Sequence, residues 1–342
     1  PYDNIVARMQ GLAGLAGVLI GQGSDELIRK FLFHTLRDLR RQPEGVLHRQ
    51  WLFPTRGGEP YPVTAGLMLE QDAVLSPDGS RVALIASAAN IPPRLITVDL
   101  RGTTQIWKRS TAEEQDALEY ALPQPMTWTG MDQQPVHGFF YPPANPRYQG
   151  IGLPPLVVYV HGGPTGQVVA NFSPFTQFFT SRGYAVLATN YRGSTGYGRE
   201  YRNKLRLMWG VYDVQDCVSG ARYLVEKGLV EAGKLVILGG SAGGFTVLKA
   251  LEEYPGFFKA GVCLYGIANQ FSALDTHKFE ARYNDSLLGA LPEAAEVYRQ
   301  RSPIFFVDQI RDPIAIFQGE DDEVVRRDQS DDMVAALRQR GI

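Results

Sequence analysis

The sequence predicts an α/β fold with a mostly parallel sheet covered on both faces by helices, preceded by a segment of short antiparallel strands. From about residue 120 onward, short apolar runs alternate with amphipathic helical patterns. The run VILGGSAGGF at 236–245 places glycines around a serine where a strand passes directly into a helix. Residues 75–100 instead combine a Pro-Asp-Gly turn with two strand-like runs, which is typical of one blade of a β-propeller.

Composition excludes several classes of partner. A chain of 342 residues is long enough for about two domains, and its 34 basic and 36 acidic residues create no broad field toward nucleic acid or membrane. The longest apolar runs, such as 153–160, are much shorter than the roughly 20 residues of a spanning helix. Cys217 and Cys263 lie in a predicted helix and strand, so we expect buried free thiols and a reducing, cytoplasmic location. The chain opens on Pro1 rather than Met, so the lack of a visible signal peptide establishes little.

The first 112 residues are predicted to be a partial β-propeller of about two blades. Residues 18–39 echo the blade pattern with an offset of 64, although Ser24 as N-cap of a helix over 25–40 is an alternative. A propeller needs at least about four blades, so we expect the chain to begin inside one. The second domain is predicted over 113–342, and ALPQPMTW at 121–128, with its two prolines, is expected to carry the connection into it.

Six strands and three helices are predicted in the second domain. The strands are apolar runs. The first helix shows apolar residues at helical spacing, the second stops before Pro255, and the third ends at Gly341. The predicted strands are 136–141, 156–160, 185–190, 235–238, 260–264 and 314–317, and the predicted helices are 213–227, 242–254 and 329–340.

Ser241 is the candidate nucleophile. It is the centre of a G-x-S-x-G pattern between a strand and a helix, the context in which a strained turn exposes a serine hydroxyl. Glycine-rich turns of this kind also cradle phosphates or simply allow close packing. The motifs described below favour the role of Ser241 as a nucleophile over these two alternatives.

A candidate oxyanion site follows the strand at 156–160. The turn HGGP at 161–164 can present a backbone N–H group, and acyl transfer requires such donors for the negative oxygen that develops. We expect the two donors to be the N–H groups of Gly163 and of Ala242, the residue after the serine. A plain Gly-Gly-Pro loop is the alternative.

The third element is the acidic loop in FQGEDDEVV at 317–325. A Ser-acid-His triad needs a carboxylate that holds the histidine tautomer, and an α/β-hydrolase places it after a late strand. The residues themselves do not choose among the four consecutive acids, Glu320, Asp321, Asp322 and Glu323.

No metal site or cofactor is expected. The chain has five histidines and none has the H-E-x-x-H spacing of a zinc site, although His277 can be interpreted as a ligand or a base.

Seven segments together resemble the catalytic domain of the prolyl oligopeptidase family of serine peptidases, in its acylaminoacyl and dipeptidyl peptidase-like branch. The resemblance extends over about 120–342, and more loosely over 72–108. It implies an α/β-hydrolase domain joined to a β-propeller and a short peptide as substrate. The segments are HGGP (161–164), NYRGSTGYGREY (190–201), WGVYDVQDC (209–217), GGSAGG (239–244), DTHKFEARY (275–283), RSPIFFVDQI (301–310) and QGEDDEVV (318–325).

The resemblance also assigns roles to single residues. The family's acid motif G-x-x-D-x-x-V falls on Gly319, Asp322 and Val325, which selects Asp322 as the triad acid. Arg282 lies near a family arginine that binds a substrate carbonyl, whereas an exposed salt bridge is the alternative. The family usually has proline after the motif's valine, and this chain has Arg326 instead.

The catalytic histidine of the family has no counterpart in the sequence. It is expected roughly 30 residues after the acid, and no histidine follows Asp322. We therefore expect the base to lie beyond Ile342 and the chain as given to be inactive; an inactive homologue is the alternative, and His161 is expected to be a scaffold residue. A carboxylesterase and a non-catalytic binding or scaffold protein are the competing functions, and the sequence leaves an oligomer open.

Overall fold

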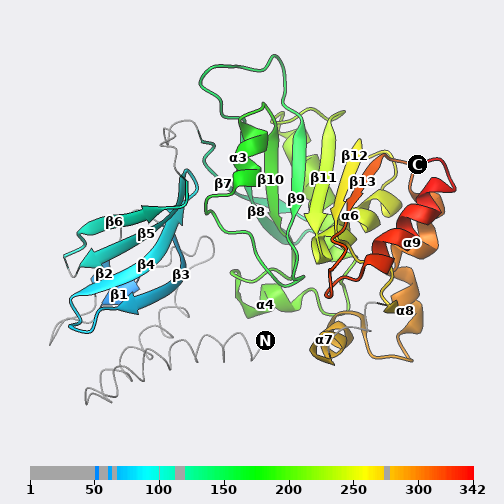
Figure 1. Ribbon diagram of the computed structural model, residues 1–342. Coiled ribbons are helices and arrows are strands. Elements are labelled where there is room, and N and C mark those ends of the chain that lie inside the picture. The colour runs from blue at the N-terminus through cyan, green and yellow to red at the C-terminus, as the bar shows by residue number, and fades with distance from the viewer. Residues whose placement is uncertain (1–50, 54–60, 64–67, 100, 112–119, 273–277) are drawn as a thin grey trace. The chain divides into compact units, whose positions relative to one another are not determined.

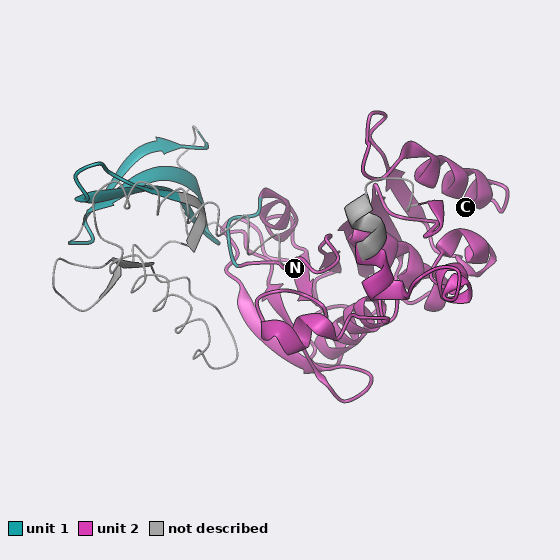
Figure 2. Ribbon diagram, turned by 90° about the horizontal axis from the view of Figure 1, so that it is seen from below, with its two compact units in different colours: residues 1–118, 170–173 teal, residues 119–169, 174–342 magenta. Residues whose placement is uncertain are grey.

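The computed structural model describes residues 51–53, 61–63, 68–99, 101–111, 120–272 and 278–342. Contacts between residues divide the chain into two units: unit 1 comprises 1–118 and 170–173, and unit 2 comprises 119–169 and 174–342 (Figure 2). The echo at 18–39, the alternative helix at 25–40 and the predicted boundary at 112 lie outside the described residues.

Unit 1 contains a four-stranded antiparallel sheet, the form expected of a propeller blade. The strands are β3 (Met68–Leu75), β4 (Arg81–Ala88), β5 (Ile91–Asp99) and β6 (Thr104–Arg109), in that spatial order, and a separate pair is formed by β1 (Trp51–Phe53) and β2 (Tyr61–Val63). Asp78 closes the predicted turn, because its carboxylate accepts hydrogen bonds from Ser76 Oγ at 2.6 Å and from the N–H of Ser80 at 3.0 Å. These bonds lower the pKa of Asp78 to about 2.

Unit 2 is built around a seven-stranded sheet of order β13-β12-β11-β9-β10-β8-β7 (Figure 1). The strands β9 to β13 are parallel to one another, and β8 runs antiparallel to β10. The six predicted strands are confirmed to within two residues: β8 (Pro135–Tyr141), β9 (Leu156–Val160), β10 (Ala185–Asn190), β11 (Leu235–Gly240), β12 (Ala260–Leu264) and β13 (Ile314–Phe317).

The prediction for 121–128 was wrong in its main part. Gln124–Thr129 is not a connection but a seventh strand, β7, which pairs antiparallel with β8 at the edge of the sheet. The two prolines, Pro123 and Pro125, suggested a linker because proline cannot donate to a strand ladder. An edge strand tolerates proline, since one side of it has no neighbour to receive that hydrogen bond.

The helices of unit 2 include the three that were predicted. These are α5 (Tyr212–Glu226), α6 (Ala242–Glu253) and α9 (Arg327–Arg338), the last displaced by two residues from its predicted bounds. The sequence reading missed shorter elements: α3 (Pro174–Thr180), α4 (Gly198–Asn203), α7 (Lys278–Leu288), α8 (Ala295–Gln300) and the 3₁₀ helix η3 (Pro303–Gln309). Within the described ranges, no helix has the length and apolar character needed to cross a membrane.

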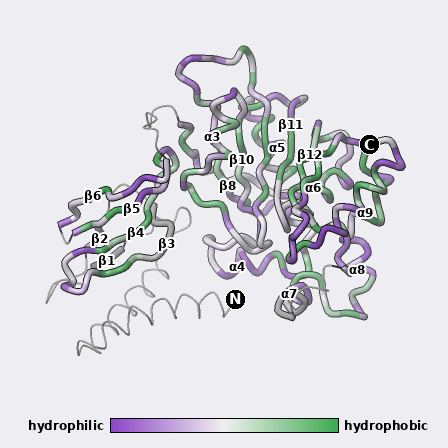
Figure 3. The backbone as a smooth tube through the Cα atoms, viewed as in Figure 1, coloured by the Kyte–Doolittle hydropathy of each residue, from purple (hydrophilic) through white to green (hydrophobic). Residues whose placement is uncertain are grey.

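Burial on both faces explains why the central strands read as continuous apolar runs. Every residue of β10 is buried, and the tube through the central strands is predominantly green in Figure 3. Cys217 on α5 and Cys263 on β12 are buried free thiols, as predicted. Burial raises the pKa of Cys263 to about 12, so this thiol stays protonated and unreactive.

The strand order has a topological switch point between β9 and β11, at the carboxyl ends of these two strands. After β9 the chain continues to β10 on one side, and after β11 it continues to β12 on the other. Crossovers that diverge in this way leave a crevice at the carboxyl ends of the two strands, where open α/β sheets bind ligands. Gly239 is the register partner of Val160, so the loops that follow the two strands begin side by side.

Candidate active site

Ser241 occupies the sharp turn between β11 and α6. Its backbone is strained, with φ of 56° and ψ of −124°, a region that side chains with a Cβ rarely adopt. The N–H of Ser241 donates to the carbonyl of Leu264 at 2.9 Å, and its own carbonyl accepts from the N–H of Phe245 at 3.0 Å. These two bonds hold the turn between β12 and the first turn of α6.

Glycines around Ser241 are required by close backbone contacts. A Cβ on Gly239 would lie 2.5 Å from the carbonyl oxygen of Gly243, and a Cβ on Gly244 would lie 2.7 Å from Cα of Gly266. A Cβ on Gly243 would collide with the carbonyl oxygen of Val160, at the end of β9. Hydrogen side chains at these positions therefore let the start of α6 approach the ends of β9 and β12.

The HGGP turn lies directly beside Ser241. A Cβ on Gly162 would be 3.3 Å from Cβ of Ser241 and 3.8 Å from its Oγ, so the turn passes within contact distance of the hydroxyl. Gly163 has φ of 117°, a conformation that favours glycine. Ala242 is the first residue of α6, and its N–H therefore has no acceptor inside the helix. Both predicted oxyanion donors line the same cavity as Ser241.

His161 supports this turn through its ring. Nδ1 donates to the carbonyl of Gly162 at 2.9 Å, so Nε2 is the acceptor of the bond from Ser194 Oγ at 2.7 Å. The ring stacks on Tyr191 with centroids 4.4 Å apart, and the Tyr191 hydroxyl donates to the carbonyl of Pro164 at 2.5 Å. Both ring nitrogens are thus hydrogen-bonded within the loops.

Burial of His161 should make the unfolding free energy of the protein depend on pH. Burial lowers the pKa of His161 from 6.5 to about 4. The unfolded chain therefore binds the proton more strongly, and the stabilisation by neutral His161 is complete above pH 6.5 and is lost as the pH falls through about 4. This pKa difference corresponds to roughly 3 kcal/mol of unfolding free energy.

The measurement compares the unfolding free energies of the wild type and His161→Gln between pH 7 and pH 4. Their difference is expected to shrink by roughly 3 kcal/mol toward pH 4. The two proteins are compared because other buried groups also titrate in this range. Burial raises the pKa of Asp213 to about 6 and of Glu252 to about 7, so these carboxyls make both proteins more stable as the pH falls, and their effect cancels in the difference. A difference that does not change with pH would contradict the neutral, buried state of His161.

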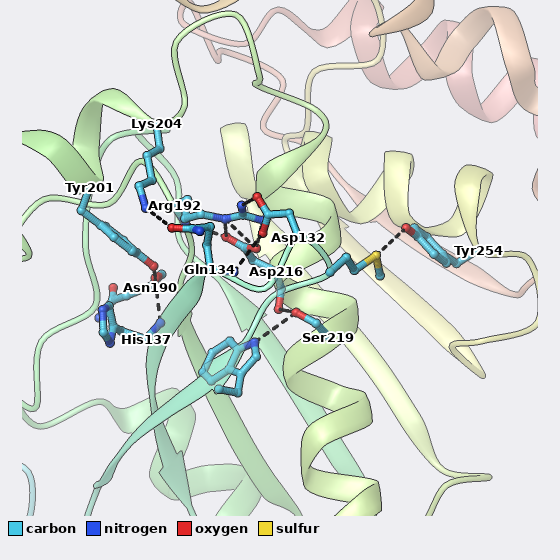
Figure 4. A network of polar contacts seen from close by, with 12 residues as sticks. Asp132, Gln134, His137, Asn190, Arg192, Tyr201, Lys204, Asp216, Ser219 and Tyr254 are labelled. Atoms are coloured by element: carbon cyan, nitrogen blue, oxygen red, sulfur yellow. Dashed lines mark hydrogen bonds and ion pairs between the residues drawn. The ribbon is translucent and has the colours of Figure 1, made fainter.

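A buried ion network anchors the loop that contains Tyr191 and Ser194 (Figure 4). Arg192 is fully buried, donates from Nη2 to Asp216 Oδ1 at 2.6 Å and also pairs with Asp132 between β7 and β8. Its backbone N–H donates to Asp216 as well, at 2.8 Å, and its guanidinium lies 3.8 Å from the ring centroid of Tyr212. The network ties the loop after β10 to α5, which fixes the support on which His161 rests.

Asp322 is the one acid of the 320–323 run that is not exposed. Its Oδ1 accepts hydrogen bonds from the N–H groups of Val324 at 2.9 Å and Val325 at 3.0 Å. Gln318 donates to Oδ2 at 3.3 Å and also to the carbonyl of Val325 at 2.8 Å. The carboxylate is therefore held in one orientation at the end of β13, two strands away from β11 in the sheet.

A cavity of about 140 Å³ lies beside Ser241. It is formed by the turn after β9, the start of α6, the loop after β12, helix α7 and the loop between β13 and α9. Asp322 does not line it, although Val324 and Val325 of the same loop do. The lining residues are Gly163, Pro164, Trp209, Ser241, Ala242, Ile267, Ser272, Tyr283, Asn284, Val324, Val325, Arg326 and Gln329.

The remaining candidates are placed only in part. Arg282 belongs to α7, but its side chain lies outside the described residues, as does His277. His137 bonds Thr127 Oγ1 at 3.0 Å and stacks on Tyr197, away from the cavity. In the part of the chain that the structure describes, no cluster of side chains is suited to hold a metal ion. The sequence reading missed Trp209, Asn284 and Gln329 as cavity residues: no local motif marks Asn284 or Gln329, and the motif that begins at Trp209 was given no role in a cavity.

Comparison with known proteins agrees with this architecture. Residues 170–342 match the model of the prolyl oligopeptidase family. The chain is 33% identical over 213 residues to dipeptidyl peptidase family member 6 of Caenorhabditis elegans, covering 59% of this chain and 29% of that protein. It is 32% identical over 194 residues to dipeptidyl aminopeptidase BIII of Pseudoxanthomonas mexicana, covering 55% of this chain and 28% of that protein.

Solved structures show the same likeness. The crystal structure of a puromycin hydrolase aligns with a TM-score of 0.77 and 36% identity, covering 82% of this chain and 43% of that chain. A puromycin-hydrolyzing peptidase of Mycobacterium tuberculosis aligns with a TM-score of 0.76 and 36% identity over the same shares.

The mostly parallel sheet and the serine turn after β11 define an α/β-hydrolase domain, preceded by an antiparallel sheet that fits part of a propeller. The chain belongs to the prolyl oligopeptidase family. It spans less than a third of the length of these two curated relatives and about two fifths of the two solved structures.

Proposed function

We propose that the protein is a serine peptidase that hydrolyses short peptides through an acyl-enzyme on Ser241. The observation that supports the proposal is that three residues line one cavity: Ser241 in its strained turn, and Gly163 and Ala242, whose N–H groups are the proposed oxyanion donors. In acyl transfer the hydroxyl oxygen attacks the peptide carbonyl, and two fixed N–H donors stabilise the negative oxygen that forms. The relatives named as peptidases support the same chemistry.

Asp322 is the proposed acid of the triad. Its Oδ1 is occupied by two backbone N–H groups, whereas the bond that Oδ2 makes to a described residue is the long one from Gln318. That oxygen is the one suited to hold the N–H of a histidine, which would fix the tautomer that removes the proton of Ser241. His137 and His161 are both bonded elsewhere, so we assign the base to a histidine that is not among the described residues.

The finer assignments are also proposals. Residues 1–112 would form part of a propeller and 113–342 the peptidase domain. Arg282 would bind a carbonyl of the peptide, since its neighbours Tyr283 and Asn284 line the cavity. The two buried free thiols favour a reducing, cytoplasmic setting.

The test measures hydrolysis of an acylated amino-acid anilide by the 342-residue chain and by the protein expressed from its complete gene. Without a base the hydroxyl stays protonated, and oxyanion donors and binding alone give about 10³ to 10⁴ over water, so the 342-residue chain should show no detectable turnover. The product of the complete gene should turn over the anilide, and Ser241→Ala should abolish this. Absence of turnover in both proteins would favour the scaffold function, and Ser241-dependent turnover by the 342-residue chain would make His161 or His277 the base to examine.

A further inference from the structure

The polar side chains of the cavity differ in whether they are already hydrogen-bonded. Gln329 is fully used: its Oε1 accepts from the N–H groups of Ala268 and Asn269, each at 2.8 Å, and its Nε2 donates to Ser272 Oγ at 2.7 Å. The hydroxyl of Tyr283 bonds Thr165 Oγ1 at 2.6 Å. These groups build the wall of the cavity and have little capacity left for a ligand.

Two other polar side chains in the wall have no such partner. Asn284 is only 7% exposed, and its amide makes no hydrogen bond to any other described residue. Trp209 is 2% exposed, and its indole Nε1 has no partner within the described ranges. A buried polar group without a partner is costly, so the amide of Asn284 is suited to receive a hydrogen-bond partner from a ligand. The indole nitrogen of Trp209 is itself inaccessible to solvent, so a ligand in the cavity does not reach it. The amide of Asn284 has two donor hydrogens and one acceptor oxygen.

Arg326 adds a positive charge to the same cavity. Among the described lining residues it is the one side chain that carries a charge at neutral pH, and it stands where the family usually has proline. Among the described residues its ion pair is with Asp328, from Nη2 to Oδ2 at 3.2 Å, between side chains that are 54% and 44% exposed. An exposed pair of this kind is weak, and a guanidinium has five N–H donors, so most of the donating capacity of Arg326 is free.

We propose that this cavity recognises a carboxylate of the substrate, with Arg326 and Asn284 as the specificity-determining residues. The proposal rests on the proposed function of Ser241, because it places the carboxylate close to the bond that is cleaved. The side chains of Arg326 and Asn284 together offer more donors than acceptors, and no acidic side chain lines the described part of the wall. An acceptor-only, charged group therefore fits it better than a neutral amide or a cation.

Two sources can supply the carboxylate: an acidic side chain of the peptide or its free C-terminus. Binding to the Ser241→Ala variant of the complete-gene protein distinguishes them without requiring turnover. One pair of ligands is acetyl-Glu-anilide and its isosteric amide acetyl-Gln-anilide. The other pair is acetyl-Ala-Ala with a free and with an amidated C-terminus. Titration calorimetry at 0.1 M salt is expected to show about tenfold tighter binding of the charged member of one pair.

Arg326→Gln in the same background should remove that preference, and the exposed position of Arg326 makes loss of the fold unexpected. Arg327→Gln is the matched control, because Arg327 is 57% exposed, pairs with Asp331 at 2.9 Å and does not line the cavity. The Arg327→Gln variant should still bind the charged ligand of that pair more tightly than the neutral one. Equal affinities within both pairs, no binding of any of the four ligands, or loss of the preference in Arg327→Gln as well would overturn the proposal. Ser241 labelling tests the proposed function separately, so the two failures are distinguishable.

Discussion

Replacing Ser241 with alanine is expected to lower peptide hydrolysis by about 10⁶-fold in the protein that carries its base, and to abolish labelling by a fluorophosphonate probe. The probe reacts only with an activated serine hydroxyl. Ser241 is held by its strained backbone beside the turn of Gly162 and Gly163, and we identified no second serine in such a turn among the described residues. Mass spectrometry of the digested, labelled protein measures the site directly.

Ser181→Ala is the control for this experiment. Ser181 is in a surface turn, where its hydroxyl donates to the carbonyl of Phe178 at 3.1 Å. Labelling and hydrolysis should both stay at the wild-type level. A label on a serine other than Ser241 would show that the nucleophile has been assigned wrongly.

Asp322→Asn is expected to lower turnover by about 10⁴-fold, whereas Asp321→Asn should have little effect. Asparagine keeps a carbonyl oxygen that can accept from the N–H groups of Val324 and Val325, so the loop should retain its shape. What it loses is the negative charge that holds the histidine tautomer and stabilises the imidazolium. Asp321 is exposed and serves as the matched control one residue away.

Turnover of both variants on one anilide substrate, with circular dichroism to check the fold, measures this difference. Small and equal losses in Asp322→Asn and Asp321→Asn would mean that another acid of the loop orients the base. Loss of the fold in Asp322→Asn would instead point to a structural role for the hydrogen bonds of its carboxylate.

Local patterns in the sequence predicted the core of the fold well. The central strands β9, β10 and β11 are apolar runs because neighbouring elements cover both of their faces, and this burial is visible as composition. Strand β7 was missed because Pro123 and Pro125 resemble a linker, and only its place at the sheet edge makes proline acceptable. The helices α3, α4 and α8 have six or seven residues, too few to show a helical period.

The chemistry of the candidate site was also marked locally. Ser241, Gly163 and Ala242 were predicted because a nucleophile turn and an oxyanion turn each need particular residues at consecutive positions. The order of the strands then brought them together. In the sequence 74 residues lie between the end of β9 and the start of β11, and the sheet makes the two strands neighbours.

The sequence by itself determined the nucleophile turn, the central strands and the family resemblance, since each depends on residues that are close along the chain. Only the tertiary structure decided which side chains surround the cavity. Trp209, Asn284 and Arg326 come from three separate segments, and their free hydrogen-bonding groups become visible only when every partner in space is known. The tertiary structure also showed that His161 uses both ring nitrogens within its own loops, because its partner Ser194 is 33 residues away.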